Sequence, residues 1–273
     1  MLPVLSRKIL NILQKVTQQG FDIVDKSMPL IADGVDIYGR FQRMFESHLL
    51  GSSLNSIVGL DRFAYKSIIQ GCTQYIDNIY ATTQRVQILR GDYRYHHRLK
   101  LAEFVSQDEL IPQVPLLISW PFVGSYRVDH RKIIASCESL NIPVHIDCAW
   151  YTASSGLNID LTSEAIASVG FSMSKGYGTG FNRVGLRYTL DPVVDTVSLQ
   201  NDFQMVPTVP VQIGIFLLAN LEPDHLWSVH GDNYHRICKD FDVTATNSIH
   251  QVLDGDRILG TADLLHFMEN TNV

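Results

Sequence analysis

Three short apolar runs between residues 141 and 188 constrain the fold of this chain more than any other feature. The first, PVHI, leads to Asp147, the second, IASVGFSMS, leads to Lys175, and the third, RVGLRY, begins at Arg183. Such runs are typical of buried strands, and open α/β sheets present ligand-contacting groups at the carboxyl ends of their strands. The spacing therefore predicts an acid, a lysine and an arginine at three strand ends.

This set of residues matches the needs of pyridoxal 5'-phosphate (PLP). The cofactor requires a lysine for a Schiff base, an acid beside its pyridine nitrogen, and cations and hydroxyls for its phosphate. The order Asp147, then Ser172-x-x-Lys175, then Arg183 resembles fold type I PLP-dependent enzymes, the aspartate aminotransferase-like group, over roughly residues 71–188. The alternative interpretation is a solvated loop lysine and a turn-forming aspartate. The residues in this order favour the cofactor site.

A glycine turn upstream predicts an anion site. Gly71, Cys72 and Thr73 open a helix, so backbone N–H groups and a hydroxyl point out of its N-terminus. The resemblance implies that Cys72 and Thr73 bind the phosphate together with Ser172 and Arg183. The alternative interpretation is that Thr73 only caps the helix.

The run Tyr93-Arg94-Tyr95-His96 follows a further strand and resembles the aromatic-x-x-His element of aspartate aminotransferases. The resemblance implies that Tyr93 stacks on the pyridine ring and that His96 orients Asp147. A histidine beside a carboxylate favours the charged carboxylate, which would in turn hold the pyridine proton. The alternative interpretation is a solvated polar turn.

Two tryptophans depart from the pattern of the resembled group. Trp120 stands where an asparagine usually precedes the proline, and Trp150 stands three residues after Asp147, where a tyrosine is common. Either indole N–H could replace a lost hydrogen bond to the cofactor's phenolic oxygen. Arg257, in the run RILG, resembles the arginine that binds a substrate carboxylate, although it could also be an ordinary hairpin residue. We therefore expect Trp120 and Arg257 to contact the substrate.

Composition excludes several classes of protein. The 273 residues are 45% hydrophobic and 18% charged with a net charge of −6, which argues against a nucleic-acid partner. The four cysteines form no CxxC pair, so we expect no metal site and no disulfide framework. Reduced cysteines of this kind indicate a cytoplasmic protein. We also expect no membrane span and no signal peptide.

The repeat of apolar strand, polar turn and amphipathic helix from residue 57 to residue 188 predicts the α/β class. We expect three αβα layers around a mainly parallel sheet, as in PLP-dependent transferases. The expected parts are an N-terminal arm with helices (1–55), a large PLP-binding domain (56–200) and a reduced C-terminal domain (201–273). The resemblance implies a homodimer, in which Tyr38 could reach the phosphate in the partner's site.

The resemblance implies an aminotransferase that acts on an amino acid or amino sugar and a keto acid through an aldimine at Lys175. A decarboxylase or lyase would use the same site, because one electron sink serves all of these reactions. A non-catalytic relative is the third hypothesis, motivated by the short C-terminal part and the two tryptophans.

Overall fold

The computed structural model describes residues 36–122 and 128–261, so most of the predicted N-terminal arm lies outside the described residues. A seven-stranded sheet with strand order β2-β9-β8-β6-β5-β3-β4 forms its centre. β6 pairs in parallel with β5 and β8, whereas β9 runs antiparallel to both of its neighbours. The strands are β2 (Tyr65–Ile69), β3 (Gln87–Leu89), β4 (Glu103–Val105), β5 (Leu116–Ser119), β6 (Val144–Cys148), β8 (Ile166–Ser172) and β9 (Gly185–Thr189).

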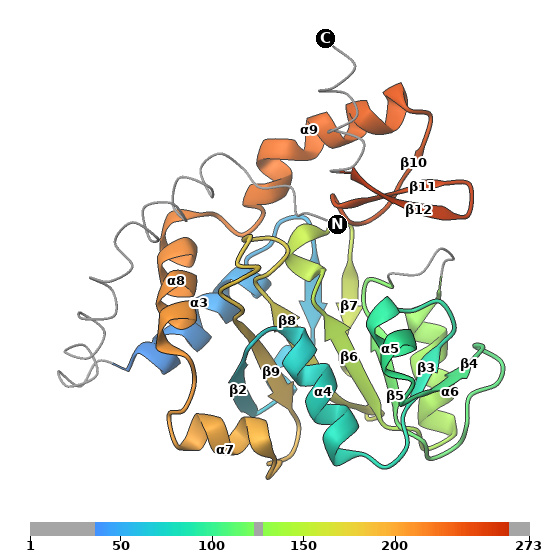
Figure 1. Ribbon diagram of the computed structural model, residues 1–273, viewed down its shortest axis with the longest axis vertical. Coiled ribbons are helices and arrows are strands. Elements are labelled where there is room, and N and C mark those ends of the chain that lie inside the picture. The colour runs from blue at the N-terminus through green and yellow to red at the C-terminus, as the bar shows by residue number, and fades with distance from the viewer. Residues whose placement is uncertain (1–35, 123–127, 262–273) are drawn as a thin grey trace.

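Helices cover both faces of the sheet, which confirms the predicted three-layer α/β fold (Figure 1). The buried residues of the helices on one face join the main hydrophobic core, and those of the helices on the other face pack in a second cluster. The first face carries α3 (Ile37–Leu50), α6 (His130–Ser139) and α8 (Thr208–Asn220), and the second carries α4 (Cys72–Thr82), α5 (Arg94–Leu99) and α7 (Thr196–Asp202).

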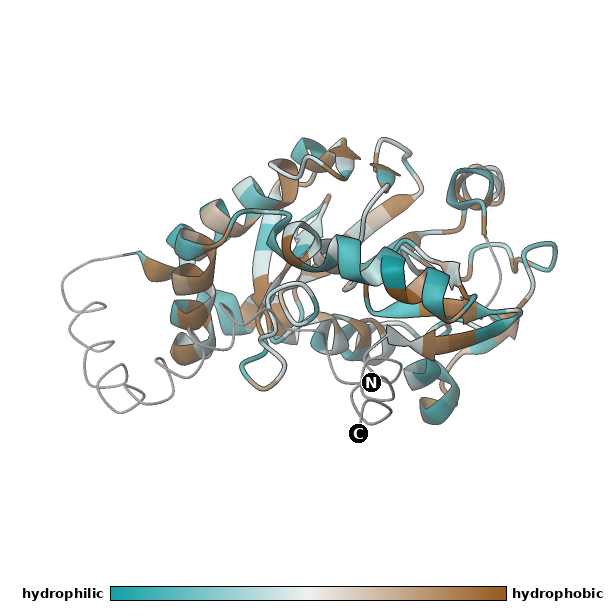
Figure 2. Ribbon diagram, turned by 90° about the horizontal axis from the view of Figure 1, so that it is seen from above, coloured by the Kyte–Doolittle hydropathy of each residue, from teal (hydrophilic) through white to brown (hydrophobic). Residues whose placement is uncertain are grey.

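The helices form where apolar spacing and capping residues agree. In α3 the buried residues Ile37, Phe41, Phe45 and Leu49 are four apart and so lie on one face. α7 begins with a capping box, in which the Asp195 carboxylate accepts a hydrogen bond from the backbone N–H three residues later. Helix α8 is apolar almost throughout, as Figure 2 shows, and it packs on α3 with its buried residues in the main hydrophobic core.

A smaller unit follows the central sheet in sequence. It contains α9 (His225–Asp240) and the antiparallel sheet of β10 (Thr244–Ala245), β11 (Gln251–Asp254) and β12 (Arg257–Gly260), with its own hydrophobic cluster. A separate parallel pair joins β1 (Ser56–Val58) to β7 (Asn158–Asp160), and short 3-10 turns lie at η1 (Leu60–Arg62) and η2 (Tyr151–Ala153). In the described part of the chain, each helix is too short or too polar to cross a membrane.

Candidate active site

The carboxyl ends of β6 and β8 meet at one edge of the sheet, and Asp147 lies there with its side chain buried. Burial raises the pKa of the Asp147 carboxyl to about 6, an effect that hydrogen bonds from the Cys72 thiol and the Ala149 N–H partly oppose. The Ala149 N–H donates to the carboxylate at 2.9 Å. Asp147 is therefore a buried acid whose proton affinity is unusually high for an aspartate.

Lys175 follows β8 and lies within electrostatic reach of Asp147. Burial lowers the pKa of the Lys175 ammonium, the charge of Arg183 lowers it further, and Asp147 opposes both effects. The ammonium stands 4.6 Å from the centre of the Trp150 ring, a cation–π geometry. The Trp150 face favours the charged ammonium, whereas burial and Arg183 make the amine easier to deprotonate than a solvated lysine.

An anion cradle lies at the start of α4. Arg183 donates through Nη2 to the Thr73 hydroxyl at 2.7 Å and through Nε to the Gln70 carbonyl at 3.1 Å. Gly71 has φ +72°, and a Cβ built there would come within 3.0 Å of Arg183 Nη2 and 3.2 Å of Ser172 Oγ. Only glycine fits this backbone and this space. The helix N-terminus, one arginine and two hydroxyls thus converge, and this donor set fits a phosphate group.

Tyr93 borders the same site from the loop before α5. Tyr93 is 37% exposed. Burial and the charge of Asp147 raise the pKa of its hydroxyl, and the charge of Arg183 partly opposes this rise. The ring packs face to face with Tyr95 at 6.0 Å and edge-on to His96 at 6.0 Å. Tyr93 therefore presents an aromatic ring beside the acid, as its predicted stacking role requires.

The predicted contact between His96 and Asp147 is absent from the described residues. The Nδ1 atom of His96 is hydrogen-bonded to the Tyr80 hydroxyl at 2.9 Å, and burial lowers the pKa of the imidazole to about 4. The prediction is corrected because the first turn of α5 directs the ring toward α4 instead of toward the end of β6.

Asp92 is the functional candidate that the sequence pattern missed. This buried carboxylate accepts hydrogen bonds from the Ser119 backbone at 3.1 Å, from the Ser119 hydroxyl, and from the Tyr93 N–H at 2.7 Å. Ser119 lies opposite Asp147 in the β5–β6 register, and the charge of Asp92 contributes to the raised pKa of Asp147. Asp92 directly precedes Tyr93, so its place in the sequence next to a predicted site residue could have indicated that it lies near the site.

The two predicted substrate residues lie apart from each other. Trp120 is buried, its backbone N–H donates to the Asp147 carbonyl at 2.9 Å, and its ring stacks on His130 at 4.4 Å. It lines a cavity of about 810 Å³ between the start of α6 and the β10–β12 sheet. Arg257 is exposed on β12 opposite Asp254 and is absent from the lining of that cavity. Arg257 therefore does not line the cavity that Trp120 borders.

Tyr38 has its partners within the chain. Its hydroxyl donates to the Val206 carbonyl at 3.2 Å and also lies 3.2 Å from the Thr208 hydroxyl, which ties α3 to the start of α8.

Solved structures identify the fold, although no family model and no curated protein matches the sequence. An alanine aminotransferase from Pyrococcus furiosus superposes with a TM-score of 0.59 at 14% identity, covering 90% of this chain and 80% of that one. A histidinol-phosphate aminotransferase from Clostridium acetobutylicum superposes with a TM-score of 0.59 at 13% identity, covering 92% of this chain and 80% of that one. A histidinol-phosphate aminotransferase from Sinorhizobium meliloti, in complex with pyridoxal-5'-phosphate, superposes with a TM-score of 0.56 at 14% identity. The match covers 90% of this chain and 71% of that one.

These similarities define the class of protein by its fold. The chain has the fold of the fold type I PLP-dependent aminotransferases, as the sequence resemblance implied. At these identities the comparisons establish the fold alone. The chemistry has to be argued from the residues of the site.

Proposed function

We propose that this protein is a PLP-dependent aminotransferase in which Lys175 holds the cofactor. The observation that carries the proposal is the placement of three groups, an acid on β6, a lysine after β8 and an arginine before β9 that bonds to Thr73 at the start of α4. Asp147 and Arg183 both act on the pKa of Lys175, and Arg183 acts on that of Asp147. An acid, an amine and a phosphate-binding cation within reach of one another form the minimal set that PLP chemistry requires.

The residues of the cradle would hold the phosphate. Arg183 supplies the charge, Thr73 and Ser172 supply hydroxyls, and the first turn of α4, beginning at Cys72, supplies backbone N–H groups. The positive φ of Gly71 and the tight contacts that a Cβ would make with Arg183 and Ser172 support this assignment, because the donors converge close to the backbone there. Tyr93 would cover the ring from the side of α5.

Asp147 and Lys175 would carry the proton chemistry. Bound PLP supplies an electron sink for negative charge that develops on the substrate. Asp147, when ionised, favours a proton on an adjacent ring nitrogen, because an opposite charge stabilises the cationic form. The lowered pKa of Lys175 favours the neutral amine, which is the form that accepts a proton as a general base.

For the substrate we propose an amino acid or amino sugar as donor and a keto acid as acceptor. The exposed position of Arg257 leaves the carboxylate-binding residue unassigned, and this observation keeps decarboxylation or elimination as the second candidate. Trp120 remains the proposed substrate contact because it lies next to Asp147 and lines the larger cavity.

The first experiment tests the lysine. Lys175→Ala protein mixed with PLP should lack the visible absorbance band that the wild type develops, and its turnover should fall by roughly 10²–10⁴-fold or more, as for loss of a general base. Borohydride reduction of the wild type should fix the cofactor to the Lys175 peptide in mass spectrometry. Lys132→Ala, at an exposed lysine on α6, is the matched control and should keep the band. A band that survives in Lys175→Ala would disprove the assignment.

The second experiment separates the reaction types. Amino donors are screened against keto-acid acceptors, with release of CO₂ and of ammonia followed in parallel. Transfer of the amino group supports the aminotransferase, whereas gas or ammonia release without an acceptor supports the second candidate. A protein that binds PLP and gives neither outcome would be a non-catalytic relative.

A further inference from the structure

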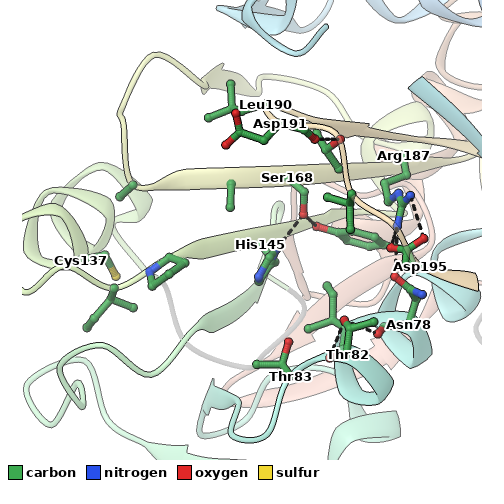
Figure 3. Close-up of a pocket in the computed structure, with 18 of the residues that line it drawn as sticks. Asn78, Thr82, Thr83, Cys137, His145, Ser168, Arg187, Leu190, Asp191 and Asp195 are labelled. Carbon is green, nitrogen blue, oxygen red and sulfur yellow. Dashed lines mark hydrogen bonds and ion pairs between the residues drawn. The ribbon is translucent and has the colours of Figure 1, made fainter. Parts of the chain in front are cut away.

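A second cavity lies at the other ends of the strands that carry the candidate active site. It has a volume of about 490 Å³ and is bordered by the start of β6, the start of β8 and the second half of α4. Figure 3 shows His145 and Ser168 side by side on the sheet, with Asn78 and Thr82 of α4, and Thr83 directly after it, across from them. The volume falls in the range of roughly 300–1,000 Å³ that small-molecule sites occupy.

A hydrogen-bonded chain of three side chains forms the inner wall. The Tyr75 hydroxyl lies 2.7 Å from Ser168 Oγ, which lies 2.7 Å from Nδ1 of His145. Burial, and after it the charge of Arg187, lowers the pKa of His145 to about 4, so the imidazole is neutral near pH 7. Among the described residues, Ser168 is the only hydrogen-bond partner of the buried Tyr75 hydroxyl, so Tyr75 donates its proton to Ser168.

This direction of the chain decides where the His145 proton lies. If Tyr75 donates to Ser168, then Ser168 donates to Nδ1, and the neutral imidazole carries its proton on Nε2. Nε2 has no hydrogen-bond partner within residues 36–122 and 128–261. Because His145 is half-buried and lines the cavity, this N–H is available to a ligand there.

Arg187 carries a second unused donor. Its terminal nitrogens bind Asp195, Asn78 and Ser67, and the ion pair with Asp195 is almost completely buried. Its Nε–H is buried and has no partner among the described residues. This nitrogen is closed to the cavity as well as to water, so Arg187 forms part of the cavity wall and does not bond a ligand through Nε.

The rim of the cavity carries negative charge, in contrast to the hydrogen-bond donors of its inner wall. Glu138 and Asp191 are exposed there, and in the described part of the chain no cation forms an ion pair with either. The Arg187 charge is already neutralised by Asp195, so the rim leaves the cavity acidic. Such a rim attracts an ammonium group and repels a phosphate dianion.

We propose that this cavity is a second binding site, distinct from the PLP site, for a small free amino acid. The carboxylate of the ligand accepts a hydrogen bond from Nε2 of His145, and its ammonium faces the acidic rim around Asp191. The binding itself goes beyond the proposed function and does not depend on it.

Coupling to the candidate active site follows from shared elements, and this consequence rests on the proposed function. Tyr75 lies one turn beyond Cys72 and Thr73 on α4, and Ser168 lies on the strand that leads to Ser172. An amino acid that tightens the Tyr75–Ser168–His145 chain would also bias the position of the phosphate cradle. Thermodynamic linkage then requires PLP to change the affinity of the amino acid by the same factor.

The experiment measures binding to cofactor-free protein, so that its failure is distinguishable from failure of the proposed function. Each of the common amino acids is titrated by calorimetry into the wild type and into Lys175→Ala, with acetate and ethylamine as single-group probes. At least one amino acid should bind both proteins equally, and each single-group probe should bind at least about tenfold more weakly, the loss expected for hydrogen bonds or charge contacts to charged groups.

Variants locate the site. His145→Phe keeps an aromatic ring and removes the donor, and it should weaken binding about tenfold. Asp191→Asn changes only an exposed rim charge and should weaken binding several-fold. Its matched control is Asp254→Asn, at the exposed last residue of β11, which should leave binding unchanged.

The proposal is overturned if no amino acid binds, or if acetate binds as well as the amino acids do. It is also overturned if binding disappears in Lys175→Ala, because the ligand would then occupy the PLP site. Circular dichroism checks the fold of His145→Phe, and if that variant does not fold, unchanged affinity in Asp191→Asn is sufficient to refute the proposed site.

Discussion

Asp147 and Asp92 are two carboxylates buried within electrostatic reach of each other at the ends of neighbouring segments. Burial raises the pKa of both groups, and hydrogen bonds from Ser119 and Tyr93 oppose that rise at Asp92. A buried like-charged neighbour disfavours the ionised form of Asp147. Without a cation on the cofactor side, an ionised Asp147 therefore destabilises the fold.

The pH dependence of stability tests this conclusion. Asp147 has a pKa of about 6 in the folded protein and an ordinary value of 3.8, so between these values the folded chain binds more protons than the unfolded chain. The contribution of Asp147 to the free energy of unfolding then falls as pH rises from about 4 to 6, by up to about 3 kcal/mol.

Urea unfolding of cofactor-free wild type and Asp147→Asn across this range measures the effect. Other groups titrate here as well, including the buried histidines, so the difference between the two proteins is the quantity to follow. The variant should gain stability relative to the wild type as pH rises. A difference that stays constant with pH would mean that Asp147 has an ordinary pKa.

At the scale of elements, the packing of α4 on β8 positions the phosphate cradle. Gly170 lies in the middle of β8, directly beneath the Tyr75 ring, and a Cβ there would come within 2.6 Å of that ring. Tyr75 is fully enclosed and bonded to Ser168, so it cannot turn away freely. The glycine therefore sets how closely the helix approaches the strand.

Gly170→Ala should push α4 away from the sheet. We expect a loss of about 1–3 kcal/mol in the free energy of unfolding, the usual effect of overpacking, together with weaker PLP binding because Cys72 and Thr73 move with the helix. Urea unfolding and fluorescence titration with PLP measure the two effects.

Gly180→Ala is the matched control, since its Cβ would meet no heavy atom within 4 Å. We expect that change to stay within about 0.5 kcal/mol. Equal losses in the two variants would contradict the packing argument.

At the scale of the whole molecule, several large apolar side chains that follow Lys175 in sequence are exposed. Phe181 is fully exposed, Phe203 is 72% exposed and Met205 is 70% exposed. Exposed apolar side chains indicate an interaction surface where they form one contiguous patch, and a dimer contact would remove these three from water. The predicted division of the chain near residue 200 remains a proposal, and α7 lies across that boundary while packing on β2.

We predict that the protein is a homodimer through this part of its surface. Light scattering at micromolar concentration should report twice the mass of the chain, and Phe181→Ser should shift the protein toward monomer. Leu101→Ser, at an apolar residue that is 61% exposed beyond α5, is the control and should leave the dimer intact. A monomeric wild type that still binds PLP would contradict the prediction.

Local pattern was sufficient to predict the three-layer fold, because apolar runs that end in polar residues have few other ways to pack. The runs before Asp147 and Lys175 are strands β6 and β8, and the glycine turn at Gly71 opens α4. The ends of parallel strands meet by construction, so residues at those ends could be grouped from sequence alone.

Side-chain direction and long-range contacts could not be predicted in this way. Whether His96 faces Asp147 or Tyr80 depends on the angle at which α5 leaves the sheet, and the position of Arg257 depends on how the small sheet is placed. The pairing of Asp92 with Ser119 and the chain from Tyr75 to His145 join segments far apart in sequence. Sequence determined which elements form, because that depends on neighbouring residues. Tertiary structure alone decided which polar groups share a dry environment, because burial and partners exist only once the layers have packed.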